Sequence, residues 1–158
     1  TLAQFMEVSD PQRLHEVHGG STIVFDAMAH QSPQDRYDIV RFLIAQGAEL
    51  TGTNSENETL FHILFSRPKH NMAQTVELTK LLIDAGADIN QPDAKGRVAL
   101  QYLISHPKLT DRDMAPLYDL LFTRCRLDPS IKNAWGYTPI DLAQKLPYRA
   151  DLLRRMAE

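Results

Sequence analysis

The sequence predicts an all-α protein built from repeated helical segments, and three observations support that fold class. A helix ending that closes on glycine recurs along the chain, and a helix opening follows each ending at a constant offset. The stretches between an opening and the next ending each contain proline. Self-similarity with a period of about 20 to 50 residues is typical of repeat proteins, in which each unit packs on its neighbours.

The helix endings show the repetition most clearly. Residues 42–50 read FLIAQGAEL and residues 81–89 read LLIDAGADI, so apolar helix residues lead to Gly-Ala, an acid and an apolar residue in both. Gly86 can adopt the left-handed backbone that ends a helix. Residues 121–129, LFTRCRLDP, form a weaker copy in which Arg126 replaces the glycine. The third ending therefore has two alternatives, another turn geometry or some left-handed strain at the arginine.

A helix opening follows ten residues after each glycine position, at Asn57, Gly96 and Gly136. The last opening is the fullest, because Thr138 can cap a helix and Pro139 suits its first position. The four openings span residues 20–28, 57–65, 96–104 and 136–144. The constant offset indicates that the loop between an ending and the next opening is a fixed structural piece.

These motifs resemble the ankyrin repeat over about residues 20–158. GYTPIDLA is close to the family's helix opening Gly-x-Thr-Pro-Leu-His-x-Ala, LLIDAGADIN is close to its second-helix ending, and FHIL keeps its histidine at His62. The resemblance implies an ankyrin-repeat solenoid of stacked helix pairs joined by β-hairpin finger loops, and a structural role for His62. One such pair cannot bury its apolar face alone, so stacking would form the core. The implied repeats lie near 20–56, 57–95 and 96–135, with a C-terminal cap repeat at 136–158.

The repeats exceed the family's usual period of about 33 residues. Because the loop offset is constant, the additional residues must lie between the two helices of each repeat. The predicted lengthened inter-helix turns are 30–35, 66–74 and 105–116, and each contains proline, which stops a helix. They are interpreted either as tolerated loop growth or as a second contact surface.

Both ends of the chain are predicted to cap the stack. Residues 1–19 read as N-terminal capping helices, the second of them begun by Asp10 as cap and Pro11 as first residue. Residues 148–158 form an amphipathic pattern with Leu152, Leu153 and Met156 directed inward. Repeat proteins need such terminal caps, because an inner repeat would otherwise expose its apolar face.

Composition narrows the classes of function. The chain has 158 residues, 43% hydrophobic and 23% charged, with a formal net charge of −3, which is ordinary for a globular domain. It lacks the basic surplus of nucleic-acid-binding domains and any apolar run of about 20 residues that could span a membrane. A single cysteine fits a reducing compartment, so we expect a cytoplasmic monomer that binds neither nucleic acid nor membrane. Its start at Thr1 leaves open that it is a fragment of a longer protein.

Candidates for chemistry are few. Cys125 lies between Arg124 and Arg126, so a depressed thiol pKa is conceivable, but no partnered base is evident. His15 and His18 could share a helix face as metal ligands, without a second ligand pair to support them. The sequence contains no phosphate-binding loop or protease signature. We expect no metal, no cofactor and no enzymatic activity, and a small enzyme with an unrecognised site is the alternative.

The resemblance also implies where a partner would bind, since ankyrin proteins contact partners through finger tips and exposed first-helix residues. Carried over to this sequence, the partner site comprises Ser55, Glu56, Glu58, Lys95, Arg97, Trp135, Tyr137, Arg67 and His106. Trp135, the only tryptophan, is either an exposed hot spot or lies flat on the neighbouring finger near Pro92 or Lys95. Mixed acidic, basic and aromatic positions suit a polypeptide better than a phosphate backbone. The expected function is protein binding, with inhibition or neutralisation of an enzyme or toxin as an alternative.

Overall fold

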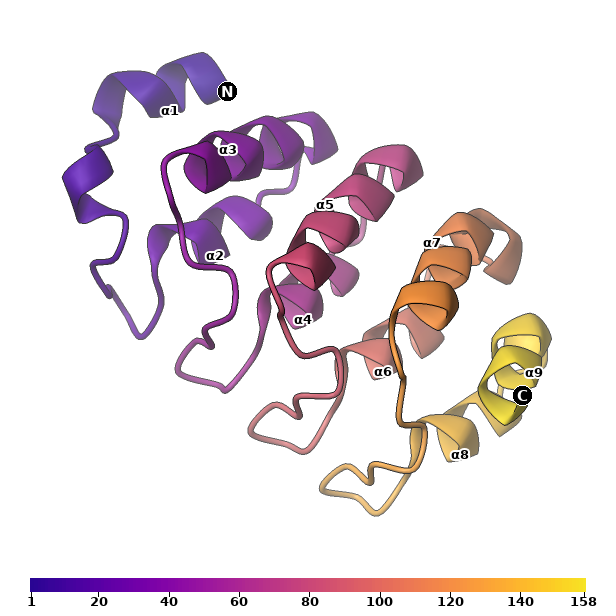
Figure 1. Cartoon of the computed structure of the whole chain (residues 1–158). Coiled ribbons are helices and arrows are strands. Elements are labelled where there is room, and N and C mark those ends of the chain that lie inside the picture. The colour runs from indigo at the N-terminus through magenta and orange to yellow at the C-terminus, as the bar shows by residue number, and fades with distance from the viewer.

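The computed structural model describes residues 1–158, apart from the side chain of Pro11, and the described chain is helical with no strand (Figure 1). The all-α prediction is therefore confirmed. The α-helices are α1 (Leu2–Val8), α2 (Ile23–Met28), α3 (Pro33–Ala45), α4 (Leu60–Phe65), α5 (Met72–Asp84), α6 (Ala99–Ile104), α7 (Asp111–Arg124), α8 (Pro139–Gln144) and α9 (Ala150–Ala157). Two 3-10 turns, η1 (Pro11–Arg13) and η2 (Pro147–Arg149), precede α2 and α9.

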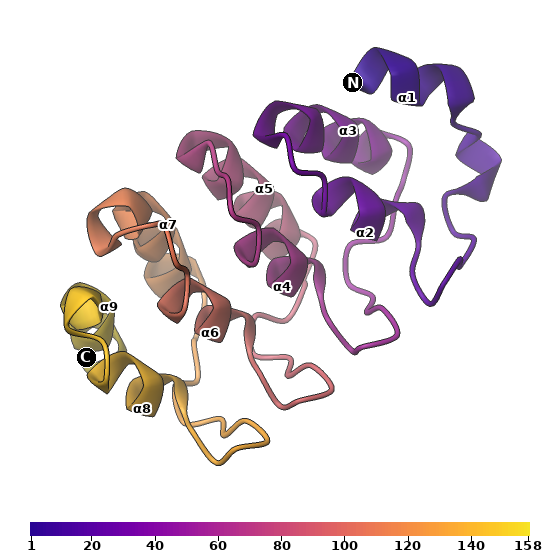
Figure 2. The same cartoon turned by 180° about the vertical axis from the view of Figure 1, so that it is seen from behind.

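The helices form two rows that run along the length of the molecule (Figures 1 and 2). One row consists of the six-residue helices α2, α4, α6 and α8, and each packs against the next in the row. The other row consists of α1, α3, α5, α7 and α9, also packed in sequence. The chain thus progresses as a stack of helix pairs, and long loops project from one side of that stack.

The core lies between the two rows. A six-residue helix is marginal by itself in water, since nucleation is costly and few backbone bonds form. The helix α4 is instead stabilised by its neighbours α2, α5 and α6, which bury Leu60, Phe61, Leu64 and Phe65 almost completely. Each such side chain contributes about 1.5–3 kcal/mol on burial. The six-residue helices are consequently apolar on most sides, whereas the helices of the other row bury one face.

The predicted inter-helix turns extend too far in the C-terminal direction. The second helix of each pair begins at Pro33, Met72 or Asp111, so the ends of the segments 30–35, 66–74 and 105–116 are helical. Each helix follows a capping side chain, Ser32, Asn71 or Thr110, that accepts a hydrogen bond from the backbone N–H three residues later. Pro33 is tolerated because the first helical amide needs no intrahelical partner, while Pro116 lies inside α7.

The helix endings follow the predicted glycine pattern twice and depart from it once. Gly47 and Gly86 are left-handed, with φ of 93° and 87°. The helix α7 instead ends at Arg124, and Cys125 continues in an extended conformation with φ −117° and ψ 148°. Of the two alternatives for the third ending, the structure shows another turn geometry, and Arg126 carries no left-handed strain.

The two ends of the chain differ from each other. At the N-terminus only α1 is an α-helix, and the second predicted capping helix is the single 3-10 turn η1. Asp10 Oδ1 accepts a hydrogen bond from the Gln12 N–H at 2.9 Å, as expected for a capping residue. At the C-terminus, α9 buries Leu152 and Met156 against α7 and α8. Across the described residues, every helix is too short or too polar to cross a bilayer.

Candidate functional site

Three projecting loops, residues 54–58, 93–97 and 133–137, repeat one closed geometry, and we call them together the loop row. In each loop the first residue donates its N–H to the carbonyl of the last residue, and the fourth residue donates to the carbonyl of the first. Both N···O distances are 3.0 Å in the first loop, where Asn54 pairs with Glu58 and Asn57 with Asn54. Both are 2.9 Å in the second loop, for Asp93–Arg97 and Gly96–Asp93, and in the third, for Asn133–Tyr137 and Gly136–Asn133.

A side-chain carboxamide or carboxylate organises each loop from inside. Oδ1 of Asn54, Asp93 and Asn133 accepts two backbone N–H groups of its own loop, at 2.9–3.1 Å. These donors are the third and fifth residues of each loop, so one side-chain acceptor fixes the backbone of both positions. These three residues were not among the predicted site residues, although their spacings of 39 and 40 residues match those of the helix endings.

The fourth loop position requires a left-handed backbone. Gly96 and Gly136 have φ of 71° and 83°, and Asn57 at the same position has φ 55°. Asparagine is among the few non-glycine residues that adopt this conformation at low cost. The alignment of Asn57 with the two glycines, visible in the sequence, therefore has a conformational reason.

Backbone hydrogen bonds join the three loops side by side. The Ala94 N–H donates to the Glu56 carbonyl at 2.8 Å, and the Ala134 N–H donates to the Lys95 carbonyl at 2.8 Å. The second and third loops approach so closely that a Cβ atom on Gly96 would lie 3.1 Å from Cα of Asn133. The loop row is thus one connected surface along a single side of the stack (Figure 2).

His62 connects the base of the first loop to the second. Its Nδ1 accepts the Thr59 N–H at 3.0 Å, so Nε2 carries the proton and donates to the Arg97 carbonyl at 2.7 Å. Burial lowers the pKa of the His62 ring, which keeps it neutral in this network. The predicted structural role of His62 is confirmed.

The acidic and basic side chains of the loop row differ in their exposure to solvent and in their hydrogen bonds. Ser55, Glu56 and Lys95 are exposed at the loop tips. Glu58 is half-buried and accepts a hydrogen bond from Asn54 Nδ2 at 3.0 Å. Arg97 is also half-buried, because its Nε donates to Oδ2 of Asp93 at 2.8 Å and its guanidinium covers the Tyr102 ring at 5.1 Å.

The third loop presents the aromatic part of the surface. Trp135 is 60% exposed and Tyr137 is 41% exposed. Nζ of Lys145 lies 3.8 Å from the centroid of the Tyr137 ring, a cation–π contact that fixes one face of that ring. Most of the Trp135 side chain is therefore accessible to solvent.

Arg67 and His106 lie apart from the loop row, and their predicted place on an exposed first-helix surface is wrong. The helices α4 and α6 end at Phe65 and Ile104, so both residues fall where the chain turns back at the opposite end of these helices. Half-buried Arg67 donates from Nη1 to the Ala29 carbonyl at 3.1 Å. His106 is buried, with Nε2 2.8 Å from the Arg67 carbonyl. Both side chains join repeats to one another.

The remaining candidates for chemistry do not assemble into a site. Burial raises the pKa of the Cys125 thiol despite the nearby Arg124 guanidinium, opposite to the depressed pKa of a reactive cysteine. His15 lies outside any helix, and the exposed His18 contacts Glu16 at 3.1 Å. Within the described part of the chain, no group of three or more His, Cys, Asp or Glu side chains could hold a metal ion.

Comparison with known proteins supports the architecture. No protein-family model matches the chain. The crystal structure of a functionally unknown protein from Leptotrichia buccalis C-1013-b is similar, with a TM-score of 0.80 and 26% sequence identity over 99% of this chain and 86% of that chain. Altogether 413 chains of known structure match. An architecture shared so widely defines a fold, while function must be argued from the residues that the fold presents.

Proposed function

We propose that this chain is an ankyrin-type repeat module that binds another protein through its loop row and catalyses no reaction. On this proposal the loops 54–58, 93–97 and 133–137 are the family's β-hairpin fingers. Their closed turns and the hydrogen bonds between neighbouring loops support that assignment. The lone cysteine, which has no second thiol for an internal disulfide, supports work in the cytoplasm.

The observation that carries the proposal is the exposure of Trp135 on a rigid loop. Burying an indole against the molecule would contribute stability, yet 60% of Trp135 faces solvent. Its backbone N–H is held by Asn133 Oδ1 at 3.0 Å, so the loop loses little conformational entropy when a partner binds. Exposed tryptophan and tyrosine on a fixed backbone are the usual centre of a protein-binding hot spot.

The charges of the neighbouring loops favour a polypeptide partner. Glu56 and Lys95 are both exposed, and the hydrogen bond between Ala94 and Glu56 places their loops next to each other. A phosphate backbone would be repelled by the first loop, whereas a polypeptide can present a basic residue to Glu56 and an acidic one to Lys95. The partner surface thus combines two opposite charges with an apolar group for Trp135.

The test is capture from a lysate of the source organism followed by affinity measurement. Wild type is compared with a Trp135→Ala/Lys95→Ala double variant and with a Tyr148→Ala/Lys80→Ala control, which removes one exposed aromatic ring and one exposed lysine elsewhere. We expect a protein that wild type and control retain and the loop-row variant loses. With that protein purified, Kd should rise by about ten-fold or more in the loop-row variant.

Equal retention by both variants would contradict the loop-row assignment. Both pairs of side chains lie on the surface, so we expect both variants to keep the fold. Far-UV circular dichroism checks this expectation.

A further inference from the structure

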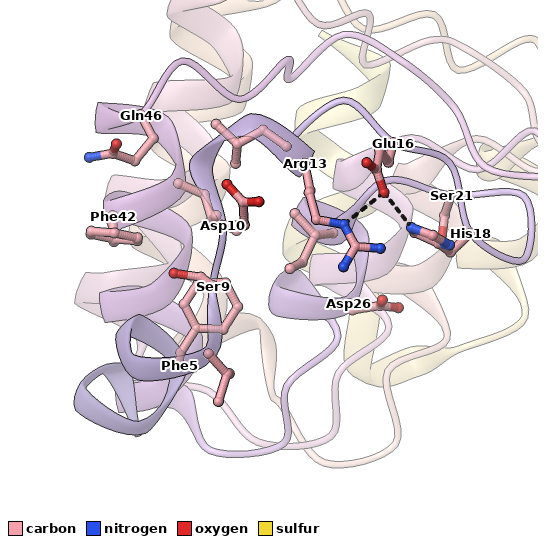
Figure 3. Close-up of a pocket in the computed structure, with 14 residues that line it drawn as sticks. Phe5, Ser9, Asp10, Arg13, Glu16, His18, Ser21, Asp26, Phe42 and Gln46 are labelled. Carbon is pink, nitrogen blue, oxygen red and sulfur yellow. Dashed lines mark hydrogen bonds and ion pairs between the residues drawn. The ribbon is translucent and has the colours of Figure 1, made fainter.

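A cavity of about 230 Å³ opens at the N-terminal end of the stack, and no residue of the loop row lines it (Figure 3). Its walls come from α1, the segment that follows α1, α2 and α3. The apolar part of the wall includes Phe5, Leu14, Ile23 and Phe42, and the rings of Phe5 and Phe42 meet edge to face with centroids 6.2 Å apart. An apolar pocket of this size can hold an aromatic ring or a large aliphatic side chain.

The polar part of the wall is acidic. Asp10, Glu16 and Asp26 line the cavity against a single arginine, Arg13, so with His18 neutral the formal charge is −3 + 1 = −2. Glu16 is partly neutralised by the Arg13 Nε at 2.9 Å (Figure 3). Asp10 and Asp26 form no ion pair with any described residue, and both are exposed. The cavity therefore favours a ligand that carries positive charge beside an apolar group.

Exposed apolar side chains occur on the segments that form the cavity wall. Val8, which lines it, is 83% exposed, and Val17, between the wall residues Glu16 and His18, is 65% exposed. Met6 on α1 is 51% exposed. A small molecule confined to the cavity would leave these side chains in water, whereas a polypeptide segment would cover them. The occupant that fits both the cavity and its surroundings is a chain segment.

We propose that this cavity is a docking site for a basic polypeptide segment, which inserts one aromatic or large aliphatic side chain. The inserted group contacts Phe5, Ile23 and Phe42, and flanking lysine or arginine residues face Asp10 and Asp26. The residues that line the cavity are distinct from those of the loop row, so the proposal does not depend on the function proposed above and can be tested independently of it.

The test uses short synthetic peptides and amide chemical shifts of the ¹⁵N-labelled full chain. Three capped peptides of the form Lys-Arg-Ser-X-Ser-Arg-Lys, with Phe, Leu or Trp at X, are titrated beside the same peptide with Ala at X and beside Glu-Glu-Ser-Phe-Ser-Glu-Glu. We expect at least one apolar basic peptide to bind about ten-fold or more tightly than the Ala and acidic peptides. The perturbed amides should include Phe5, Ser9 and Ile23, and affinity should fall with added salt.

Charge reversal supplies the matched variants. Asp26→Lys should weaken binding of the apolar basic peptide about five-fold or more, because it changes the sign of one wall charge. Glu77→Lys makes the same change at an exposed position on α5, outside the cavity wall, and should leave binding unchanged. The proposal is overturned if no basic peptide binds, if the acidic peptide binds equally well, or if the perturbed amides lie only in residues 133–137. Equal weakening by both variants would likewise overturn it, as would binding of phenethylamine alone without any peptide.

Discussion

At the scale of single residues, His62 shows how one side chain can join two repeats. Both ring nitrogens are used, Nδ1 within its own helix cap and Nε2 at the Arg97 carbonyl 35 positions later. The His62→Ala variant would leave the Thr59 N–H and the Arg97 carbonyl without these partners and would open a cavity. We expect a loss of about 2–4 kcal/mol in the free energy of unfolding, measured by urea titration.

The matched control for that variant is His15→Ala, because His15 is exposed and outside the helices. It should change the free energy of unfolding by less than about 0.5 kcal/mol. A His62 variant as stable as the His15 control would show that the ring's hydrogen bonds contribute nothing to the stack.

A second histidine, His70, should make the protein sensitive to acid. Its Nε2 lies 2.8 Å from the Arg67 carbonyl, its Nδ1 lies 2.7 Å from the Thr75 hydroxyl, and the His106 ring packs against it at 5.6 Å. Burial, reinforced by the nearby Arg36 guanidinium, lowers the pKa of His70 to about 4 from the ordinary value of 6.5. The folded protein therefore holds this ring neutral where the unfolded chain would protonate it.

The sign of the pH dependence follows from that difference. Above pH 6.5 the ring is neutral in both states, and its contribution to stability is complete. As the pH falls from 6.5 towards 4, only the unfolded chain binds the proton, so stability is lost, by up to about 3 kcal/mol. Urea titrations between pH 7.5 and 5.5 should show a steeper loss for wild type than for His70→Gln. Parallel slopes would contradict the assignment to His70.

At the scale of structural elements, glycine has two roles in the loops: it adopts a left-handed backbone, and it allows a neighbouring loop to approach closely. Gly96 and Gly136 occupy the same loop position and both are left-handed, so alanine is strained at either by about 1–2 kcal/mol. Only at Gly96 would the new Cβ also meet a neighbouring loop, 3.1 Å from Cα of Asn133, whereas nothing lies within 4 Å at Gly136. Gly96→Ala should therefore cost more than Gly136→Ala by about 1 kcal/mol or more in urea titration. Equal costs would mean that the loops separate easily.

The same loops show what could be predicted from sequence and what could not. The constant offset of ten residues correctly placed a fixed loop before α4, α6 and α8. The spacing of Asn54, Asp93 and Asn133 was visible too, but side-chain acceptors have no hydrophobic period to reveal them. The inter-helix turns were overestimated because the residues after each proline were assigned to the turn, although Pro33 begins α3 and Pro116 lies inside α7.

Only part of the candidate site could be predicted from the sequence, namely the residues whose position follows from the recurring loop motif. The loop positions of Trp135 and Lys95 follow from a motif that recurs in register, but the motif left open whether the Trp135 ring faces solvent or lies on the neighbouring loop. His106 follows the end of a helix, where packing depends on contacts with other repeats that no local pattern encodes. The cavity beside Phe5 is a tertiary feature of an irregular segment, and no local sequence pattern indicates it.

At the scale of the whole molecule, two buried arginines, Arg36 and Arg149, link neighbouring repeats by donating to carbonyls of the inter-helix turns. Arg36 donates from both Nη atoms to the Lys69 carbonyl at 3.2 Å, near the N-terminal end of the stack. Arg149 is fully buried near the other end and donates to the carbonyls of Ile104, His106 and Leu109 at 2.8–2.9 Å. In a stack where each repeat contacts only its neighbours, such links control how far unfolding spreads.

These two arginines allow a test of whether the ends unfold separately. Trp135, the only tryptophan, lies in the loop before α8 and reports on the C-terminal end, whereas far-UV circular dichroism averages all helices. Arg149→Ala leaves three carbonyls without a donor and should cost about 3 kcal/mol or more locally. Its Trp135 fluorescence transition should then occur at lower urea than the dichroism transition. Arg36→Ala destabilises the N-terminal end instead, so its dichroism transition should occur at lower urea than its Trp135 fluorescence transition. Coincident transitions in both variants would instead show that the links make all repeats unfold as one unit, so that damage at either end reaches the loop row.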